Sequence, residues 1–216
     1  MFTIVVNSQK GGSGKSSLCR VLGVEASRRM HSVFLIDTDD QGSLRAWHEA
    51  RAAEEPRRVE LSAEALPQGL ALLGQHGAEF VFIDTPPNAS DRLDDVFALA
   101  DLVVIPIKPT PDDLKSAAVT VARVKALGRP FLFVITQAIQ NTNITAQAIA
   151  ALSHHGRVAQ TIMVNRVSYP AAFTDGRSPQ EIEPKGQAAR EIGKLWDDIE
   201  ACLHANMKEE RKAANG

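Results

Sequence analysis

Short apolar runs recur along the chain and constrain its fold more than any other feature of the sequence. The six runs are Phe2–Val6, Ser32–Asp37, Glu79–Asp84, Asp101–Ile107, Pro130–Thr136 and Gln160–Asn165. They are rich in Val, Ile and Phe and do not alternate with polar residues. This composition is typical of strands that are buried on both faces, as in a parallel sheet covered by helices.

Segments with a helical spacing of apolar residues lie between and after these runs. They are predicted over Lys15–Met30, Leu114–Leu127 and Gly186–His204. Strands and helices in this order predict an α/β fold with a doubly wound, mostly parallel sheet and helices on both of its faces. We expect one domain over residues 1–206 and a charged, flexible tail over 207–216, because the tail has no apolar face.

Charge and cysteine content argue against several classes of protein. The formal net charge is −2, so attraction to nucleic acid or to a membrane would require a local patch. Cys19 and Cys202 lie far apart and outside any C-x-x-C pair, which favours two buried thiols in a cytoplasmic protein. We expect no membrane partner, because no signal-peptide pattern and no membrane-spanning apolar stretch is present.

A glycine-rich stretch, VNSQKGGSGKSSL, follows the first run and precedes a predicted helix. It differs from the phosphate-binding pattern G-x-x-x-x-G-K-[ST] in having Gln9 at the first glycine position, followed by an additional lysine, Lys10. The glycines would let backbone N–H groups point at phosphate oxygens, with Lys15 adding charge and Ser16 offering its hydroxyl to Mg²⁺. The loop residues expected to bind nucleotide are Gly11, Gly12, Ser13, Gly14, Lys15, Ser16 and Ser17. An ordinary glycine-rich turn is the alternative.

Aspartates end the second and third runs, where parallel strands point into a ligand-binding crevice. Asp84 suits a metal-side carboxylate that acts through a Mg²⁺-bound water, and Asp37 would face the same ion. Asp39 could orient the water that attacks the phosphate. For Asp40, a solvated acidic turn ahead of a helix N-cap at Ser43 is the alternative.

Three of these stretches, QKGGSGKSS, LIDTDDQGS and FIDTPP, resemble the deviant Walker A, Walker A′ and Walker B motifs of the ParA/MinD family of ATPases. The resemblance continues through ADLVVIPIKPTPDDL and TIMVNRVSYPAAFTDGRSPQEI and extends to about Leu203. The chain is most similar to the short, ParF-like ParA proteins.

The resemblance implies a role for the additional lysine. Lys10 matches the family's signature lysine, which crosses the interface of an ATP-sandwich dimer and contacts the phosphates bound by the other subunit. Lys10, Lys15 and Asp39 would then be the catalytic residues, with ATP and Mg²⁺ as cofactors. Pro109 would lie near the adenine, although a plain rigid turn is the alternative there. Asp40 stands where many relatives have proline.

The resemblance also implies a function. The chain would be a slow, partner-stimulated ATPase that partitions plasmid or chromosomal DNA in the cytoplasm, associated with the nucleoid. Its partners would be a second copy of itself in the presence of ATP, a ParB-type centromere-binding protein, and DNA of any sequence. The same ATPase could instead position carboxysomes or chemotaxis clusters. A MinD-like membrane cycle, an amide-forming synthetase and an iron–sulfur relative are further alternatives, each with a weaker basis in the sequence.

Composition alone does not indicate where DNA would bind. From Ala151 onward the chain has nine Lys or Arg and nine Asp or Glu residues. The candidate DNA-binding residues are Arg166, Lys185, Arg190 and Lys194. They would form a patch if the fold gathers them on one face, and dispersed, solvated charges are the alternative.

Overall fold

The computed structural model describes residues 1–87, 92–140 and 142–214. Its strands are β1 (Phe2–Val6), β2 (Val33–Asp37), β3 (Arg57–Val59), β4 (Phe80–Asp84), β5 (Leu102–Ile107) and β6 (Phe131–Ile135). Its helices are α1 (Lys15–Arg28), α2 (Ser43–Glu49), α3 (Leu66–Gln75), α4 (Leu93–Ala98), α5 (Pro111–Ala126), α6 (Asn143–Ser153), α7 (Ser168–Phe173), α8 (Pro179–Ile182) and α9 (Gln187–Ala214), with a short 3₁₀ helix at Ala63–Ala65.

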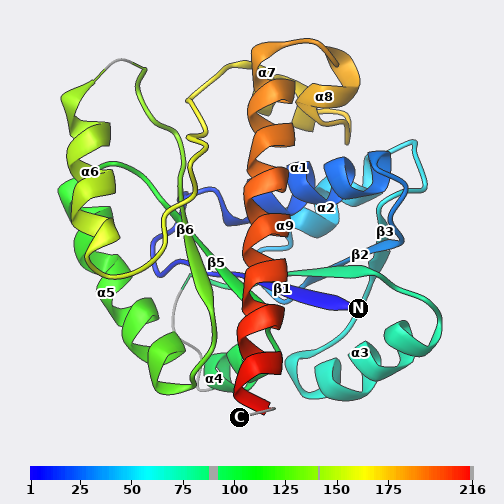
Figure 1. The fold of residues 1–216 in the computed structure, drawn as a ribbon. Helices are drawn as coiled ribbons and strands as arrows, with labels where there is room; N and C mark the ends of the chain where they lie inside the picture. Colours follow the sequence, from blue (N-terminus) through cyan, green and yellow to red (C-terminus); the bar gives the residue numbers. More distant parts are fainter. Residues whose placement is uncertain (88–91, 141, 215–216) are drawn as a thin grey trace.

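The strands form one parallel sheet in the order β3-β2-β4-β1-β5-β6, with helices on both faces (Figure 1). Ile4 and Val6 of β1 face a core shared with α1 and α9, while Val5 faces a second core shared with α3 to α6. This burial of both faces explains why the strands read as continuous apolar runs, and it confirms the predicted doubly wound α/β fold.

The sixth apolar run is not a strand of this sheet, which corrects the sequence prediction. The run joins the end of β6 through an isolated bridge between Ala138 and Val164, with Met163 N–H donating to the Ile135 carbonyl and Asn165 N–H to the Ala138 carbonyl, both at 2.9 Å. Two other amide groups of the run bond to carboxylates of α9: Thr161 N–H donates to Asp198 Oδ2 at 2.8 Å and Val164 N–H to Glu191 Oε2 at 3.3 Å. The sixth strand is β3, whose sequence RRV is too short and too charged to produce an apolar run.

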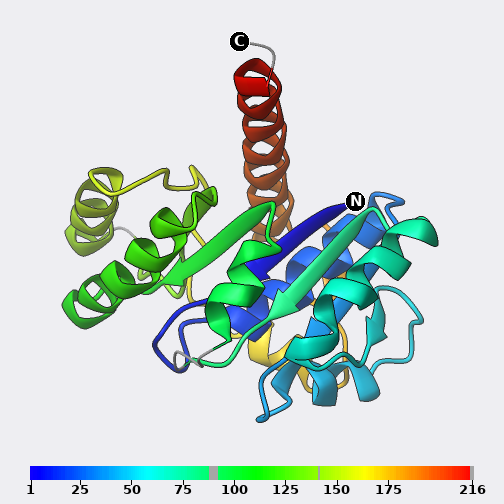
Figure 2. The same cartoon turned by 90° about the horizontal axis from the view of Figure 1, so that it is seen from below.

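Helix α9 is longer than predicted. It continues as far as Ala214 without a break at residue 207, and Figure 2 shows its C-terminal part extending beyond the body of the domain. The flexibility of residues 207–216 therefore stays a prediction, whereas residues 207–214 are helical. Across the three described segments of the chain, no helix combines the length and the apolar content needed to cross a membrane.

Candidate nucleotide-binding site

The loop between β1 and α1 is held in a conformation that depends on glycine. Gly12 and Gly14 have φ of +70° and +101°, a region that favours glycine. The end of β6 fixes the loop, because Thr136 Oγ1 donates to the Ser13 carbonyl at 2.7 Å and Gln137 Nε2 to the Gly12 carbonyl at 2.7 Å. The N-terminus of α1 therefore faces a curled, anchored loop, as a phosphate site requires.

Lys15 begins α1, and its side chain bends back onto the loop. It is 7% exposed, and its Nζ donates to the carbonyls of Ser8 at 3.2 Å and Lys10 at 3.3 Å. Burial lowers the pKa of Lys15, while the charges of Asp84 and Asp39 oppose this change. The ammonium group is thus placed among carbonyls at the loop, where an anion would be a stronger partner.

Asp37 and Asp84 lie side by side at the carboxyl ends of neighbouring strands, where β2 and β4 pair in register. Both Asp84 oxygens are buried and have no hydrogen-bond partner among the described residues. Burial raises the pKa of Asp84 to about 7, with the nearby Ser16 hydroxyl opposing the rise and the charge of Asp37 adding to it. Asp37 differs, because its oxygens accept the N–H groups of Asp39 at 3.0 Å and Arg45 at 2.9 Å.

These residues fit a magnesium ion that is shared with a nucleotide. A buried carboxylate without a partner is suited to an ion or to its bound water, and the Ser16 hydroxyl lies close to it. In the described part of the chain, no three His, Cys, Asp or Glu side chains converge to bind a metal without further ligands. Mg²⁺ commonly completes its octahedron with waters and phosphate oxygens, so Ser16 and Asp84, with Asp37 beside Asp84, would suffice as protein groups.

Asp39 and Asp40 follow β2 and both line one hollow beside it, and Asp39 lines a second hollow as well. Asp39 lines a cavity of about 440 Å³ above the glycine loop, the loop cavity, and its Oδ1 accepts the Gln41 N–H at 3.0 Å. Asp40 is exposed and lines a separate hollow together with Arg45 and Arg58. The predicted water-orienting residue is therefore at the cavity, whereas the carboxylate that replaces the family's proline is outside it.

The loop cavity gathers most of the residues that were predicted to bind nucleotide. Its lining comprises Gly11, Gly12, Gly14, Lys15, Ser16, Ser17, Arg20, Asp39, Gln41, Ser43, Pro87 and Gln137. Ser13 is fully buried beneath the loop, and its hydroxyl has no hydrogen-bond partner among the described residues. Arg20 was not predicted from the sequence, because no motif includes it.

Lys10 lies beside the loop cavity but does not line it. Its side chain is 41% exposed, and its Nζ is 3.3 Å from Asp113 Oδ2 and 3.8 Å from Asp112 Oδ2. Asp113 also accepts the Thr110 hydroxyl at 2.5 Å, at the start of α5. Lys10 therefore contacts the first turn of α5 and does not line the cavity that its own loop forms.

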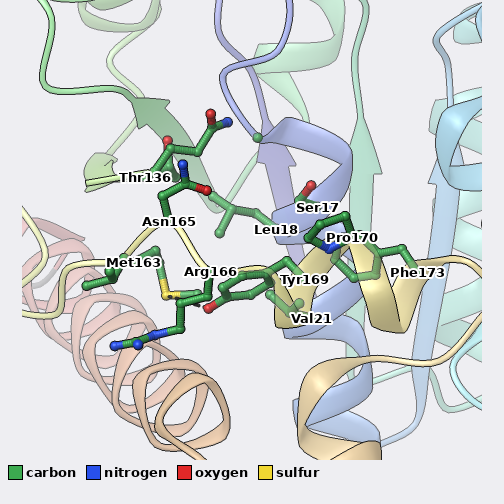
Figure 3. Close-up of a pocket in the computed structure, with 13 residues that line it drawn as sticks. Ser17, Leu18, Val21, Thr136, Met163, Asn165, Arg166, Tyr169, Pro170 and Phe173 are labelled. Carbon is green, nitrogen blue, oxygen red and sulfur yellow. Dashed lines mark hydrogen bonds between the residues drawn. The ribbon is translucent and has the colours of Figure 1, made fainter. Parts of the chain in front are cut away.

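A second hollow of about 190 Å³, the side cavity, adjoins the loop cavity (Figure 3). The two share Gly14, Ser17 and Gln137. Its remaining lining is Leu18, Val21, Thr136, Met163, Val164, Asn165, Arg166, Tyr169, Pro170 and Phe173. The sequence analysis assigned none of the residues from 163 to 173 to the nucleotide, although they lie in the segment 161–182 that resembles the family. Pro109, which was expected near the adenine, is buried and lines neither cavity.

The four candidate DNA-binding residues lie near the start of α9, in two different environments. Arg166 forms a short ion pair with Glu191 and donates to Gln187 Oε1 at 2.7 Å. Lys185, Arg190 and Lys194 are exposed and form no ion pair with any residue that the structure describes. Arg190 and Lys194 are one helical turn apart on α9 and so lie on the same side of it.

Comparisons with known proteins agree with this geometry. A family model described as the CobQ/CobB/MinD/ParA nucleotide binding domain matches residues 4–179. Protein ParA of Rhizobium radiobacter is 25% identical over 197 residues, which cover 86% of this chain and 88% of that protein. Maintenance of carboxysome distribution protein A of Halothiobacillus neapolitanus is 26% identical over 208 residues, or 92% and 96% of the two chains.

A solved structure supports the fold. The septum site-determining protein MinD of Pyrococcus horikoshii, complexed with Mg-ADP, superposes with a TM-score of 0.78 at 14% identity. The match covers 92% of this chain and 95% of that one.

Proposed function

The chain belongs to the CobQ/CobB/MinD/ParA family of nucleotide-binding ATPases, as its motifs suggested, and from this premise we propose a more specific function. The protein is a Mg²⁺-dependent ATPase that forms an ATP-sandwich dimer. The dimer binds DNA without sequence preference and drives the partition of plasmid or chromosomal DNA. Hydrolysis is slow until a partner protein completes the site.

The position of Lys10 is the observation that carries this proposal. Its own loop already supplies backbone amides and Lys15 to a bound phosphate chain, and Lys10 points outside the loop cavity. A half-exposed lysine beside the mouth of a phosphate site could leave its pair with Asp113 and bind the phosphates of a facing subunit. Two-fold symmetry would make each such contact occur twice, which links dimerisation to the bound nucleotide.

The other residues then have distinct roles. Loop amides and Lys15 bind the phosphate chain, and Asp39 orients the attacking water. Ser16 and Asp84, with Asp37, would hold Mg²⁺, which when bound neutralises charge on the phosphates. The side cavity suits the adenine, because apolar and aromatic groups such as Tyr169 and Phe173 lie beside the exposed amide of Asn165.

The cargo follows from the relatives only in part. The ParA and carboxysome-distribution relatives are 25% and 26% identical, so sequence likeness does not separate them. A ParB-type centromere-binding protein is the proposed partner for DNA partition. Positioning of a carboxysome-like cargo by the same ATPase is the second candidate, and the carboxysome-distribution relative favours it.

Sedimentation of the Lys10→Ala variant tests the proposal. With a non-hydrolysable ATP analogue and Mg²⁺, we expect the wild type to dimerise and the variant to remain monomeric, while the two bind the analogue with similar affinity. Lys125→Ala, at the exposed far end of α5, is the matched control and should dimerise normally. A Lys10→Ala protein that dimerises as well as the wild type would contradict the sandwich mechanism.

A further inference from the structure

Arg20 extends from α1 into the loop cavity, five residues after Lys15. Its Nη2 donates to the Ser43 carbonyl at 2.5 Å, where α2 begins. Its Cζ lies 4.8 Å from the centroid of the Phe173 ring, which lines the side cavity. The guanidinium group is therefore positioned between the two cavities by contacts from α2 and α7.

The charge of Arg20 has no close counter-ion among the residues that the structure describes. Among the described residues, no carboxylate lies within 4.0 Å of its guanidinium, and only Nη2 has a hydrogen-bond partner. Its Nε is buried without a partner. Burial lowers the pKa of Arg20, whereas the more distant charges of Asp84 and Asp37 raise it.

This arrangement is costly unless an anion enters the cavity. A partly buried cation loses hydration, and a neutral carbonyl replaces only part of it. A guanidinium has five N–H donors in a planar fork and can bind a phosphate on one edge while it keeps a carbonyl on another. The cavity that Arg20 lines is the one that also contains Lys15 and Ser16.

We propose that Arg20 is a further phosphate-binding residue, which uses the phosphate chain of the nucleotide bound by its own subunit as its counter-ion. Ser43 and Phe173 orient its guanidinium for this contact. The inference rests on the proposed nucleotide site and adds to it a second cation from the same subunit. The competing explanation is that Arg20 only packs α1 against α2 and α7.

Calorimetry with adenosine, AMP, ADP and a non-hydrolysable ATP analogue distinguishes the two explanations. We expect Arg20→Met to weaken binding of phosphate-bearing ligands by about 10- to 100-fold, since it removes a charge-assisted contact. Adenosine affinity should not change. In the series adenosine, AMP, ADP and ATP analogue, the first ligand whose affinity for the variant is lower than for the wild type identifies the phosphate that Arg20 binds.

Two further variants complete the test. Arg28→Met, on the same helix, removes an arginine that donates to the Gln180 carbonyl at 2.9 Å outside both cavities, and should bind all four ligands normally. Arg20→Lys keeps the charge but loses the fork, so a smaller loss confined to phosphate-bearing ligands is expected even if Arg20→Met does not fold. Melting temperatures of the free proteins report any effect on folding.

Two results would overturn the inference. Unchanged nucleotide affinity in Arg20→Met, or an equal loss for adenosine and the nucleotides, would show that Arg20 serves packing alone. The proposed function would survive either result, provided that the wild type still dimerises with the ATP analogue through Lys10. A wild type that binds none of the ligands would instead refute both proposals.

Discussion

Among single side chains, Asp84 combines full burial with carboxylate oxygens that have no hydrogen-bond partner among the described residues. Its unfolded pKa is near 3.9 and its folded pKa is about 7, so between these values the carboxyl is protonated in the folded chain alone. The folded state then binds more protons than the unfolded state, and the free energy of unfolding falls as pH rises through this window. Above about pH 7 the loss is complete.

Asp84→Asn should remove this pH dependence, because an amide does not ionise. We expect the stability of the variant relative to the wild type to increase by about 2–3 kcal/mol between pH 5 and pH 8, by linkage from the two pKa values. Urea unfolding of both proteins across this pH range, without Mg²⁺ or nucleotide, measures the difference in their free energies of unfolding. A stability difference that does not change with pH would mean that Asp84 is already ionised near pH 5.

Asp39 and Asp40 form a natural pair of variants, because they are adjacent in sequence but Asp39 lines the loop cavity and Asp40 does not. If Asp39 orients the attacking water, Asp39→Ala should still bind ATP and persist as a dimer, while turnover falls about 100-fold or more. Asp40→Ala should hydrolyse ATP at nearly the wild-type rate. Phosphate release and light scattering measure the two properties, and loss of ATP binding in Asp39→Ala would assign it a structural role.

Among helices and strands, the sequence predicted the elements whose own apolar residues show that they are buried. β1, β2, β4, β5 and β6 are apolar because both of their faces are covered, so they could be read directly. The segment 160–165 was mistaken for a strand, because apolar composition does not reveal that α9 carboxylates take two of its amides. β3 was missed for the opposite reason, since its pairing with β2 depends on a neighbour and not on its own composition.

Helix α2 depends on a contact that the sequence could not show. Arg51, just after α2, is buried and donates to both oxygens of Glu181 on α8 at 2.6 and 2.8 Å and to the Gly176 carbonyl at 2.9 Å. This cluster fixes the end of α2 that lies away from Asp39 and the loop cavity. The separation of 130 positions between Arg51 and Glu181 explains why no local pattern predicts the contact.

Arg51→Met should therefore destabilise the protein by about 3 kcal/mol or more, because Glu181 loses its partner in a largely buried site. Arg51→Lys should lose nearly as much stability, because a single ammonium group cannot replace the planar, two-pronged guanidinium. The control is Arg177→Met, which removes an exposed pair with Asp175 and should hardly move the urea midpoint. An Arg51→Met midpoint close to that of the control would contradict the anchoring role.

For the molecule as a whole, motifs predicted residues that line the loop cavity but not those that form the side cavity. Gly14, Lys15, Asp37 and Asp84 could be predicted, because loop chemistry and strand ends place them within short stretches. The side cavity could not, because it forms where α1 meets residues about 150 positions later. Arg20 and Tyr169 acquire their positions from this packing, and neither belongs to a motif that specifies it.

The distribution of charge over the chain limits where DNA could bind. A chain with a net charge of −2 can bind DNA only through a local patch, and Glu191 already pairs with Arg166. Arg190 and Lys194 are exposed cations one turn apart near the start of α9, and a dimer would present them twice. We therefore expect binding to require ATP, to ignore sequence and to fall steeply with salt.

The double variant Arg190→Glu with Lys194→Glu should abolish most DNA binding and leave ATP binding intact. Arg211→Glu with Lys212→Glu, at the far end of the same helix, changes the net charge equally and is the control. Gel shifts with ATP analogue and with ADP, over a range of salt, make the comparison. If the two double variants lose DNA equally, net charge and not a patch at the start of α9 governs binding. Equal retention of DNA by the ADP-bound and ATP-bound wild type would contradict a partition cycle, because hydrolysis could then not release the dimer.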